Sequence, residues 1–327
     1  ARLEGSKAFA KEVMAAAAVP TAMSVVCDTQ SQVEDALDRF GPPYVVKNDG
    51  LAAGKGVVVT EDRTVALAHA ESCERVVIEE YLDGPEVSLF CLTDGETVVP
   101  LSPAQDFKRA YDGDTGPNTG GMGAYTPLPW APRDLVDDVL ERVVSPTVAE
   151  LHRRGTPYTG VLYAGLALTS RGVRVVEFNA RFGDPETQAV LARLGSPLGI
   201  LLRTAAAGSL RDLPPLRWRD GSAVTVVVAA AGYPAAPRTG DVIEGLADAE
   251  AAEGVEVLHA GTRRDSTGQL VSSGGRVLSV TATGSELAQA RRRAYAAVEQ
   301  VRLEGGHFCC DVAPAAELYT VRVPELQ

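Results

Sequence analysis

The chain of 327 residues is 45% hydrophobic and 23% charged, a balance typical of globular proteins, and it has room for two domains or a three-part enzyme. Its net charge of −12 argues against a nucleic-acid-binding protein, because such proteins bind phosphates with an excess of lysine and arginine. No apolar run reaches the ~18 residues of a membrane span, and five cysteines with neither zinc nor disulfide spacing predict reduced thiols in a cytoplasmic protein.

The first two predicted elements are helices. Ser6 is a suitable N-cap for a helix that starts at Lys7 and stops at Val19-Pro20, and a second helix runs from Ser31 to Phe40. Lys7 lies in the first turn, where the helix dipole disfavours a cation. It is therefore either a solvated surface lysine or a lysine with an anionic ligand.

A strand, a loop and a second strand are predicted between Tyr44 and Val59. Lys47 ends a strand that is otherwise apolar, so it needs an anionic partner. The loop consists of small residues and Lys55, and such a loop can lie close to a polyphosphate and donate backbone N–H groups. The alternative is an ordinary β-hairpin with a mobile tip.

The next stretch predicts a helix over 62–71, a strand over 75–80 and a hairpin around Asp94-Gly95. After the hairpin, the run from Asp112 to Tyr125 is rich in glycine and also carries Asn, Thr and Asp. We expect a long polar loop here, and in a compact domain such a loop is either functional or disordered. A floppy linker is the alternative.

A helix over 134–154, kinked or split at Pro146, leads to paired strands over 158–168 and 173–178. Alternation along the second strand places Glu177, Asn179 and Arg181 on one face. A carboxylate and an amide oxygen on one face can hold a hard cation such as Mg²⁺. The alternative is an edge strand with a solvated polar face.

The remaining elements begin with helices over 186–194 and 197–207, and Leu213-Pro214-Pro215 is the best domain boundary. Beyond it the pattern predicts a small α+β unit with a helix over 285–300. Its strands are expected at 223–231, 255–259, 270–273 and 276–283.

Two stretches, Arg181 to Gln188 and Asp112 to Gly123, resemble the signatures of the phosphoribosylamine–glycine ligase family, a member of the ATP-grasp superfamily. The resemblance implies an α+β ATP-grasp fold in which two α+β subdomains clasp ATP. It implies an ATP-grasp domain over 1–213, with a hairpin lid over about 21–82, and a C-terminal α+β domain over 216–327. The family's N-terminal domain has no counterpart in this sequence, so either the chain is a fragment or residues precede Ala1.

The resemblance also implies a reaction: ATP, glycine and 5-phosphoribosylamine give glycinamide ribonucleotide, ADP and phosphate by way of glycyl phosphate. The implied metal is Mg²⁺ or Mn²⁺, held by Glu177 and Asn179. The implied catalytic residues are Arg181, Asp184 and Lys108. The implied ATP-binding residues are Lys7, Lys47, Lys55, Glu79, Glu80, Tyr81, Leu82 and Glu86. The implied substrate-binding residues are Asp106, Asp114, Asn118, Thr119, Gly120 and Gly121.

Two other functions remain open from the sequence. One is a different ATP-grasp ligase, such as a carboxylase of the purine or biotin type, against which the run from Asp114 to Gly123 argues. The other is a nucleotide-binding module without catalysis. In every case we expect small-molecule partners, no nucleic acid, no membrane, and a cytoplasmic monomer.

Overall fold

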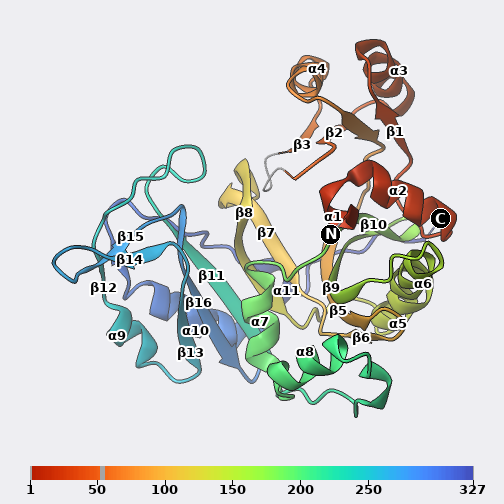
Figure 1. Cartoon of the computed structure of the whole chain (residues 1–327). Coiled ribbons are helices and arrows are strands. Elements are labelled where there is room, and N and C mark those ends of the chain that lie inside the picture. The colour runs from red at the N-terminus through yellow and green to blue at the C-terminus, as the bar shows by residue number, and fades with distance from the viewer. Residues whose placement is uncertain (1, 52–55, 327) are drawn as a thin grey trace.

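The computed structural model describes residues 2–51 and 56–326. Its strands form two four-stranded sheets, one five-stranded sheet and two short ribbons (Figure 1). Within these ranges, none of the helices is long and apolar enough to cross a membrane.

Two helices, α1 (Arg2–Gly5) and α2 (Lys7–Ala16), open the chain. The Ser6 side chain accepts a hydrogen bond from the Phe9 N–H, which confirms the predicted N-cap. The apolar face of α2 is buried against the main core, so its N-terminus is held in a fixed position.

The lid is the first sheet with its two helices, and Figure 1 shows it apart from the rest of the molecule. Its strands have the order β1-β4-β2-β3 and are all antiparallel. A separate small core of aliphatic residues joins the helices to this sheet. The elements are β1 (Ser24–Cys27), α3 (Gln30–Phe40), β2 (Tyr44–Asn48), β3 (Val57–Thr60), α4 (Arg63–Glu71) and β4 (Val76–Glu79).

The central sheet has the order β10-β9-β5-β6. The predicted helix over 134–154 is present as α5 (Leu135–Val139), a π-helical turn (Leu140–Val144) and α6 (Ser145–Arg153). Pro146 follows the π-helical turn, where the Ser145 N–H donates to the Leu140 carbonyl, so the wider winding of the helix coincides with the residue that lacks an N–H. The strands are β5 (Glu86–Asp94), β6 (Val98–Pro100), β9 (Thr159–Thr169) and β10 (Gly172–Asn179).

The expectation of strict alternation along β10 was wrong at one point. The pairing of β10 with β9 shifts between Val175 and Glu177, which is a β-bulge. A bulge inserts one residue and so re-aims the side chains that follow it. Glu177 and Asn179 still share a face, because the Asn179 amide contacts the Glu177 carboxylate at 3.3 Å.

The third sheet has the order β13-β16-β11-β8-β7, and α7 and α10 pack on it. Strands β7 and β8 precede residue 213 and β11, β13 and β16 follow it, so this sheet crosses the predicted domain boundary. The elements are β7 (Gln105–Tyr111), β8 (Thr115–Thr126), α7 (Glu186–Arg193), β11 (Ser222–Ala229), β13 (Val255–His259), β16 (Arg276–Gly284) and α10 (Leu287–Val298).

The predicted polar loop over 112–125 is therefore corrected to a β-hairpin formed by β7 and β8. Gly113 lies in the turn with φ +70°, and Gly116 follows within β8 with φ +80°, both values that favour glycine. Backbone pairing with β7 and β11 satisfies the polar groups of β8, so side-chain polarity does not prevent a strand.

The other elements are two ribbons, a helix that packs on β5 and β9, and shorter helices. Two ribbons are formed by β12 (Ile243–Glu244) with β17 (Arg302–Leu303), and by β14 (Thr262–Arg264) with β15 (Leu270–Ser272). The remaining helices are α8 (Leu198–Ala206), a 3₁₀ turn (Leu210–Asp212), α9 (Leu246–Glu250) and α11 (Pro314–Glu317). All five cysteines are free thiols, as the sequence predicted.

Candidate functional site

Lys47 lies at the end of β2 and forms a buried ion pair. Its Nζ is 2.8 Å from Glu79 Oε2, and Lys11 Nζ is 3.0 Å from Glu79 Oε1. Burial alone lowers the pKa of Lys47, but Glu79 outweighs it and the pKa lies above its ordinary value. Burial raises the pKa of Glu79, but the two lysines lower it by more, so the pKa lies below its ordinary value. The anionic partner that Lys47 requires is thus present within the chain.

The N-terminus of α2 is joined to the lid through Asp49 and Gly50. Asp49 Oδ1 accepts hydrogen bonds from the Ala8 N–H at 3.1 Å and from Ser6 Oγ at 3.1 Å. Lys7 Nζ donates to the Gly50 carbonyl at 3.1 Å. Burial lowers the pKa of Lys7, although the nearby Glu177 opposes this shift. Lys7 is therefore a partly desolvated cation that faces the acidic end of β10.

The connection from β4 to β5 carries the residues predicted to contact a nucleotide base. Glu80 Oε1 accepts from the Met23 N–H at 2.9 Å and pairs with Arg171 at 2.9 Å. Tyr81 is half exposed and Leu82 is half-buried. The backbone here joins the lid to the central sheet, which is the position of a hinge.

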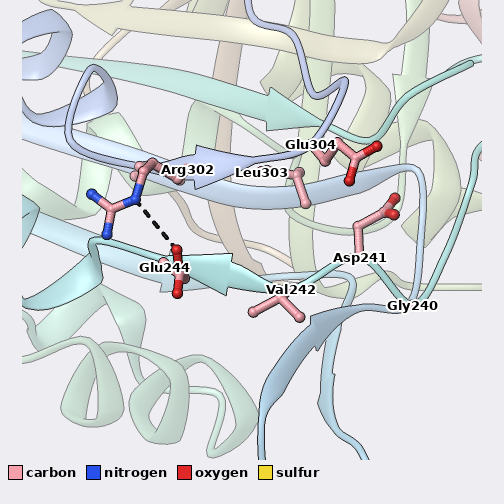
Figure 2. A pocket seen from close by; sticks show the side chains of 8 residues that line it. Gly240, Asp241, Val242, Glu244, Arg302, Leu303 and Glu304 are labelled. Atoms are coloured by element: carbon pink, nitrogen blue, oxygen red, sulfur yellow. Dashed lines mark hydrogen bonds and ion pairs between the residues drawn. The ribbon is translucent and has the colours of Figure 1, made fainter.

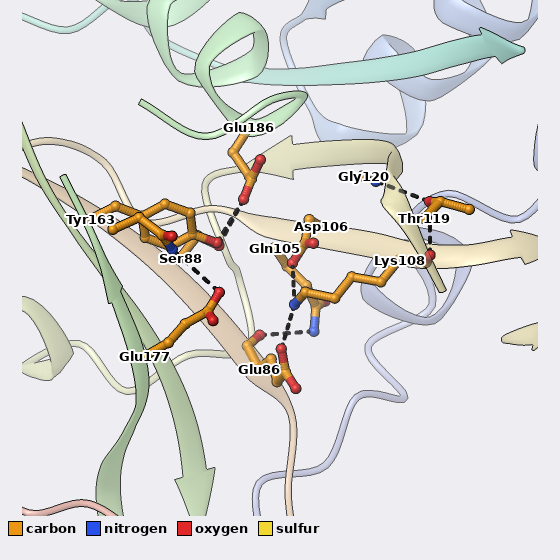
Figure 3. A network of polar contacts seen from close by, with 12 residues as sticks. Glu86, Ser88, Gln105, Asp106, Lys108, Thr119, Gly120, Tyr163, Glu177 and Glu186 are labelled. Atoms are coloured by element: carbon orange, nitrogen blue, oxygen red, sulfur yellow. Dashed lines mark hydrogen bonds and ion pairs between the residues drawn. The ribbon is translucent and has the colours of Figure 1, made fainter. Parts of the chain in front are cut away.

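Lys108 on β7 connects two carboxylates (Figure 3). It forms an ion pair with Glu86 and another with Asp106 Oδ1, the latter at 3.1 Å. Burial lowers the pKa of Lys108, but the two acids raise it well above its ordinary value. Burial raises the pKa of Asp106 to about 6 even though Lys108 opposes the shift.

The end of β10 carries the predicted metal ligands and Arg181. Lys47 Nζ donates to the Val176 carbonyl at 3.1 Å, so this lysine lies beside Glu177. The Asn179 amide points to the Glu177 carboxylate, and a 180° rotation of that amide would direct its oxygen to the same point. A carboxylate and an amide oxygen fit a hard divalent cation, which takes few protein ligands when phosphates supply others.

Arg181 and Asp184 follow β10 and are both exposed. Arg181 Nε donates to Glu4 Oε1 at 2.9 Å, and its NH1 donates to the Phe182 carbonyl. Asp184 Oδ1 accepts from the Gln188 amide at 3.0 Å.

A buried cluster of hydroxyls and one carboxylate lies next to these residues, and the sequence analysis did not identify it. Glu186 Oε1 accepts from Tyr163 OH at 2.7 Å and from Ser88 Oγ at 3.2 Å. Glu186 is 3% exposed, and its negative charge raises the pKa of Asp106. Glu186 lies within the signature run from Arg181 to Gln188, which could have singled it out. Ser88 and Tyr163 lie on apolar strands that give no such signal.

The β7–β8 hairpin carries the residues predicted to bind substrates. Thr119 Oγ1 donates to the Lys108 carbonyl at 2.8 Å and accepts from the Gly121 N–H at 3.0 Å. Asn118 pairs with Arg109 across the hairpin. Asp114 lies in the exposed turn with φ +54°, beside Gly113, whose N–H donates to Asp311.

The structure thus brings most of the predicted residues to one region between the lid, β5, β7 and β10. Lys47 is influenced by Glu177 and Glu86, and Lys7 by Glu177, Lys47 and Glu79. Asp114 lies at the far end of the hairpin, next to the C-terminal segment. Lys55 lies outside the described residues.

A shallow pocket at the β12–β17 ribbon contains none of the predicted residues (Figure 2). Its lining includes Val242 and Leu303, flanked by Asp241, Glu304 and an exposed Glu244–Arg302 ion pair. The polar groups described above belong to a different part of the molecule.

Comparisons with known proteins identify the family of this chain. Residues 5–187 match the family model described as phosphoribosylglycinamide synthetase, ATP-grasp (A) domain, and residues 223–315 match the C domain of the same synthetase. A phosphoribosylamine–glycine ligase of Streptomyces coelicolor is 66% identical over 97% of this chain and 76% of the relative.

Comparison with solved structures indicates the same family. The crystal structure of phosphoribosylamine–glycine ligase from Thermotoga maritima superposes with a TM-score of 0.86 at 36% identity, over 96% of this chain and 80% of that one. The biotin carboxylase domain of the Hydrogenobacter thermophilus 2-oxoglutarate carboxylase, solved with MgADP, has a TM-score of 0.70 at 18% identity, over 97% of this chain and 69% of that one, and shows likeness of fold alone. The chain belongs to the phosphoribosylamine–glycine ligase family and has its ATP-grasp fold.

Proposed function

We propose that the chain ligates glycine to 5-phosphoribosylamine at the expense of ATP, giving glycinamide ribonucleotide, ADP and phosphate, a step of purine biosynthesis. Membership of the family supports the reaction. The supporting observation is that Lys7 and Lys47 lie near enough to Glu177 for its charge to raise the pKa of both lysines. Lys47 also donates to the carbonyl of the preceding Val176, at the junction of lid and central sheet. Cations for phosphates and ligands for a metal are what phosphoryl transfer requires.

ATP is proposed to lie between the lid and the central sheet. Its phosphates would be neutralised by Lys7, Lys47 and the sequence-predicted Lys55. Its adenine would meet the backbone at Tyr81 and Leu82, where the hinge leaves β4. The acidic residues proposed to complete this site are Glu79, Glu80 and Glu86. Since Glu79 and Glu86 already pair with lysines, they would act partly by fixing those cations.

Glu177 and Asn179 are proposed to hold Mg²⁺ or Mn²⁺. The bound metal would supply charge neutralisation of the transferring phosphoryl group. The donor set supports a hard cation, because both residues offer oxygen and share one face of β10.

The acyl transfer is assigned to residues around the hairpin. A carboxylate is a poor acyl donor, so phosphorylation of glycine creates a good leaving group, which the amine of phosphoribosylamine then displaces. Arg181 would stabilise the transferring charge, and Lys108 and Asp184 would orient the reactants. Closure of the lid would exclude water from the glycyl phosphate. The proposed substrate contacts are Asp106, Asp114, Asn118, Thr119, Gly120 and Gly121.

The test is ADP release measured with glycine and phosphoribosylamine supplied together and singly. The proposal expects ADP release only with both substrates. Turnover that depends on bicarbonate instead would favour a carboxylase. ATP binding by calorimetry without turnover would favour a binding module.

We also propose a division into an ATP-grasp domain (1–213, lid about 21–82) and a C-terminal domain (216–327). The chain is proposed to act as a cytoplasmic monomer on small molecules, without nucleic acid or membrane partners. The net charge of −12 supports the absence of a nucleic-acid partner.

A further inference from the structure

We propose that Arg276 and Tyr233, from the C-terminal part of the chain, are positioning residues that fix the β7–β8 hairpin against the turn at Asp184. The inference rests on the proposed function, which assigns both the hairpin and Asp184 to the site. Neither residue lies in the stretches that suggested that function, and each acts through backbone groups of other residues.

Gly120 is held at both of its main-chain polar groups. Its N–H donates to Tyr233 OH at 3.1 Å, and its carbonyl accepts from Arg276 NH1 at 2.7 Å. A glycine without side-chain restraint has wide backbone freedom, which these two bonds remove. The conformation of the hairpin at Gly120 is therefore set by two residues from the C-terminal part of the chain.

The same guanidinium nitrogen reaches the turn that follows β10. Arg276 NH1 donates to the Asp184 carbonyl at 2.6 Å and lies 3.3 Å from Asp184 Oδ1. It also lies 3.3 Å from the Gly121 carbonyl. One cation thus joins the hairpin, the turn and strand β16, which are distant in sequence.

The hairpin and the turn at Asp184 pack closely against each other. A Cβ built on Gly121, where φ is +111°, would lie 2.4 Å from Pro185 Cδ. A Cβ on Gly120 would lie 3.0 Å from Arg276 Cζ. Because Arg276 also donates to carbonyls in both segments, loss of its guanidinium removes a contact from each of them.

Gly275 lets the ring of Tyr233 lie directly against the backbone. A Cβ on Gly275 would lie 2.3 Å from Tyr233 Cδ2, so the tyrosine ring packs directly on the backbone beside Arg276. The two side chains form one clamp around Gly120. The clamp does not include Lys7, Lys47 or the hinge, which are the proposed ATP contacts.

This separation gives the kinetic signature of the clamp. Misplacing the hairpin by about 1 Å would disturb glycine and amine alignment, at a cost of roughly 10-fold to 100-fold. ATP affinity should remain near that of the wild type. A purely structural role would instead lower stability while leaving the KM values of the folded fraction unchanged.

The experiment compares the full chain with Arg276→Lys, Arg276→Ala and Tyr233→Phe. Arg264→Lys is the matched control, since Arg264 lies exposed on β14 and donates to the local Gly268 carbonyl. We expect Arg276→Lys to raise the KM of glycine and phosphoribosylamine and to lower kcat, about tenfold or more in kcat/KM. Tyr233→Phe should show the same pattern more weakly. Free guanidinium ion at a non-denaturing concentration should restore part of the activity of Arg276→Ala.

The wild-type measurement distinguishes a failure of the proposed function from a failure of the clamp. A wild-type chain without glycine-dependent and amine-dependent turnover overturns the proposed function, and the clamp with it. If the wild type is active, unchanged KM and kcat in Arg276→Lys overturn the clamp alone. ATP affinity that falls in proportion to kcat/KM in the Arg276 variants also overturns it.

Discussion

Arg181 offers a fork of donors at the end of β10, and only part of that fork is engaged, by Glu4 and by the Phe182 carbonyl. In Arg181→Lys the charge stays but the two-pronged geometry is lost. We expect ATP affinity to stay nearly constant while turnover falls about 10²–10³-fold, because Arg181 meets charge that develops during transfer. Calorimetry and ADP release on one preparation measure both quantities. Arg203→Lys on α8 is the control. Parallel losses of affinity and turnover would make Arg181 a ground-state ATP ligand instead.

Asp106 should give the site an unusual pH dependence. Its pKa is raised to about 6 by burial, with Lys108 opposing, so the carboxyl gains a proton at a higher pH than usual. Turnover should therefore fall as pH drops through about 6, because protonated Asp106 no longer pairs with Lys108. The free energy of unfolding should change in the opposite direction. The pKa of Asp106 in the folded state exceeds its ordinary value of 3.8, so the folded state binds the proton at a higher pH than the unfolded chain. The folded state therefore gains stability as pH falls from about 6 toward 3.8.

The measurements for Asp106 are kcat/KM and urea unfolding between pH 7 and 4. Both the acid limb of the rate and the gain in stability should be missing in Asp106→Asn. Asp248→Asn, at an exposed position on α9, should keep both. A rate profile in Asp106→Asn with an unchanged acid limb would assign that limb to another group.

Local patterns explain which of these residues the sequence could predict. The sequence predicted that Glu177 and Asn179 share a face, because a spacing of two on a strand places side chains on one side, and their contact confirms this. Lys47 was found to need an anion, but its partner Glu79 is set by the pairing of β2 with β4, which the sequence does not specify. Arg276 and Glu4 lie far along the chain from the groups that they hold, so no local pattern reveals them.

The lid and α2 are linked as elements by Asp49, which accepts from the Ala8 N–H and from Ser6 Oγ. We expect Asp49→Ala to lower the free energy of unfolding by about 1–2 kcal/mol, the usual cost of a lost helix-capping group. It should also weaken ATP binding, because β2 carries Lys47 and α2 carries Lys7. Urea unfolding and calorimetry test the two effects.

Asp62→Ala is the matched control for Asp49. Asp62 caps α4 within the lid, where its Oδ1 accepts from the Thr64 N–H at 2.7 Å. It should cost a similar amount of stability and leave ATP affinity unchanged. Equal loss of affinity in the two variants would reduce the Asp49 effect to general destabilisation of the lid.

The glycine-rich hairpin is the element that composition misrepresented. Glycine and asparagine are disfavoured in strands, so a loop was expected over 112–125. Strand β7 nevertheless pairs along β8, and β11 pairs with its last residues, so tertiary pairing outweighs propensity. The longer helices, by contrast, were predicted to within about three residues at each end, since a capping side chain and a stripe of apolar residues are local features. The short helices α1, α9 and α11 were not predicted, because so few residues carry no periodic pattern.

At the scale of the whole molecule, the main hydrophobic core extends across the predicted boundary at 213–216. It contains aliphatic residues from both sides of that boundary, including Leu89, Leu166, Val226 and Leu278. We expect both sides to unfold together. Trp130 packs on the main core from before the boundary, and Trp218 packs against residues that also precede it. Phe308, which packs on the main core from the C-terminal side, is the position for a second reporter.

The test uses urea unfolding followed by fluorescence in two variants. Trp218→Phe keeps Trp130, and the combination of Trp130→Phe, Trp218→Phe and Phe308→Trp leaves one tryptophan on the C-terminal side. The remaining tryptophan in each variant should report the same midpoint once the stability change of the substitution is measured by circular dichroism. A midpoint for one tryptophan that differs from the circular dichroism midpoint of the same variant would show two independently folding units.

The pairing of β8 with β11 also has a consequence for synthesis of the chain. Thr126 pairs with Ala223, so about 100 residues separate the partners, and at ordinary elongation rates the ribosome takes roughly 5–20 s to reach the second from the first. During that interval one edge of β8 has no neighbour, and open edges invite pairing with other nascent chains. The edge that β11 later covers runs from Gly123 to Thr126, and very short edges are one way in which proteins limit unwanted strand pairing. The shortness of this pairing thus limits the exposure of β8 before the sheet is complete.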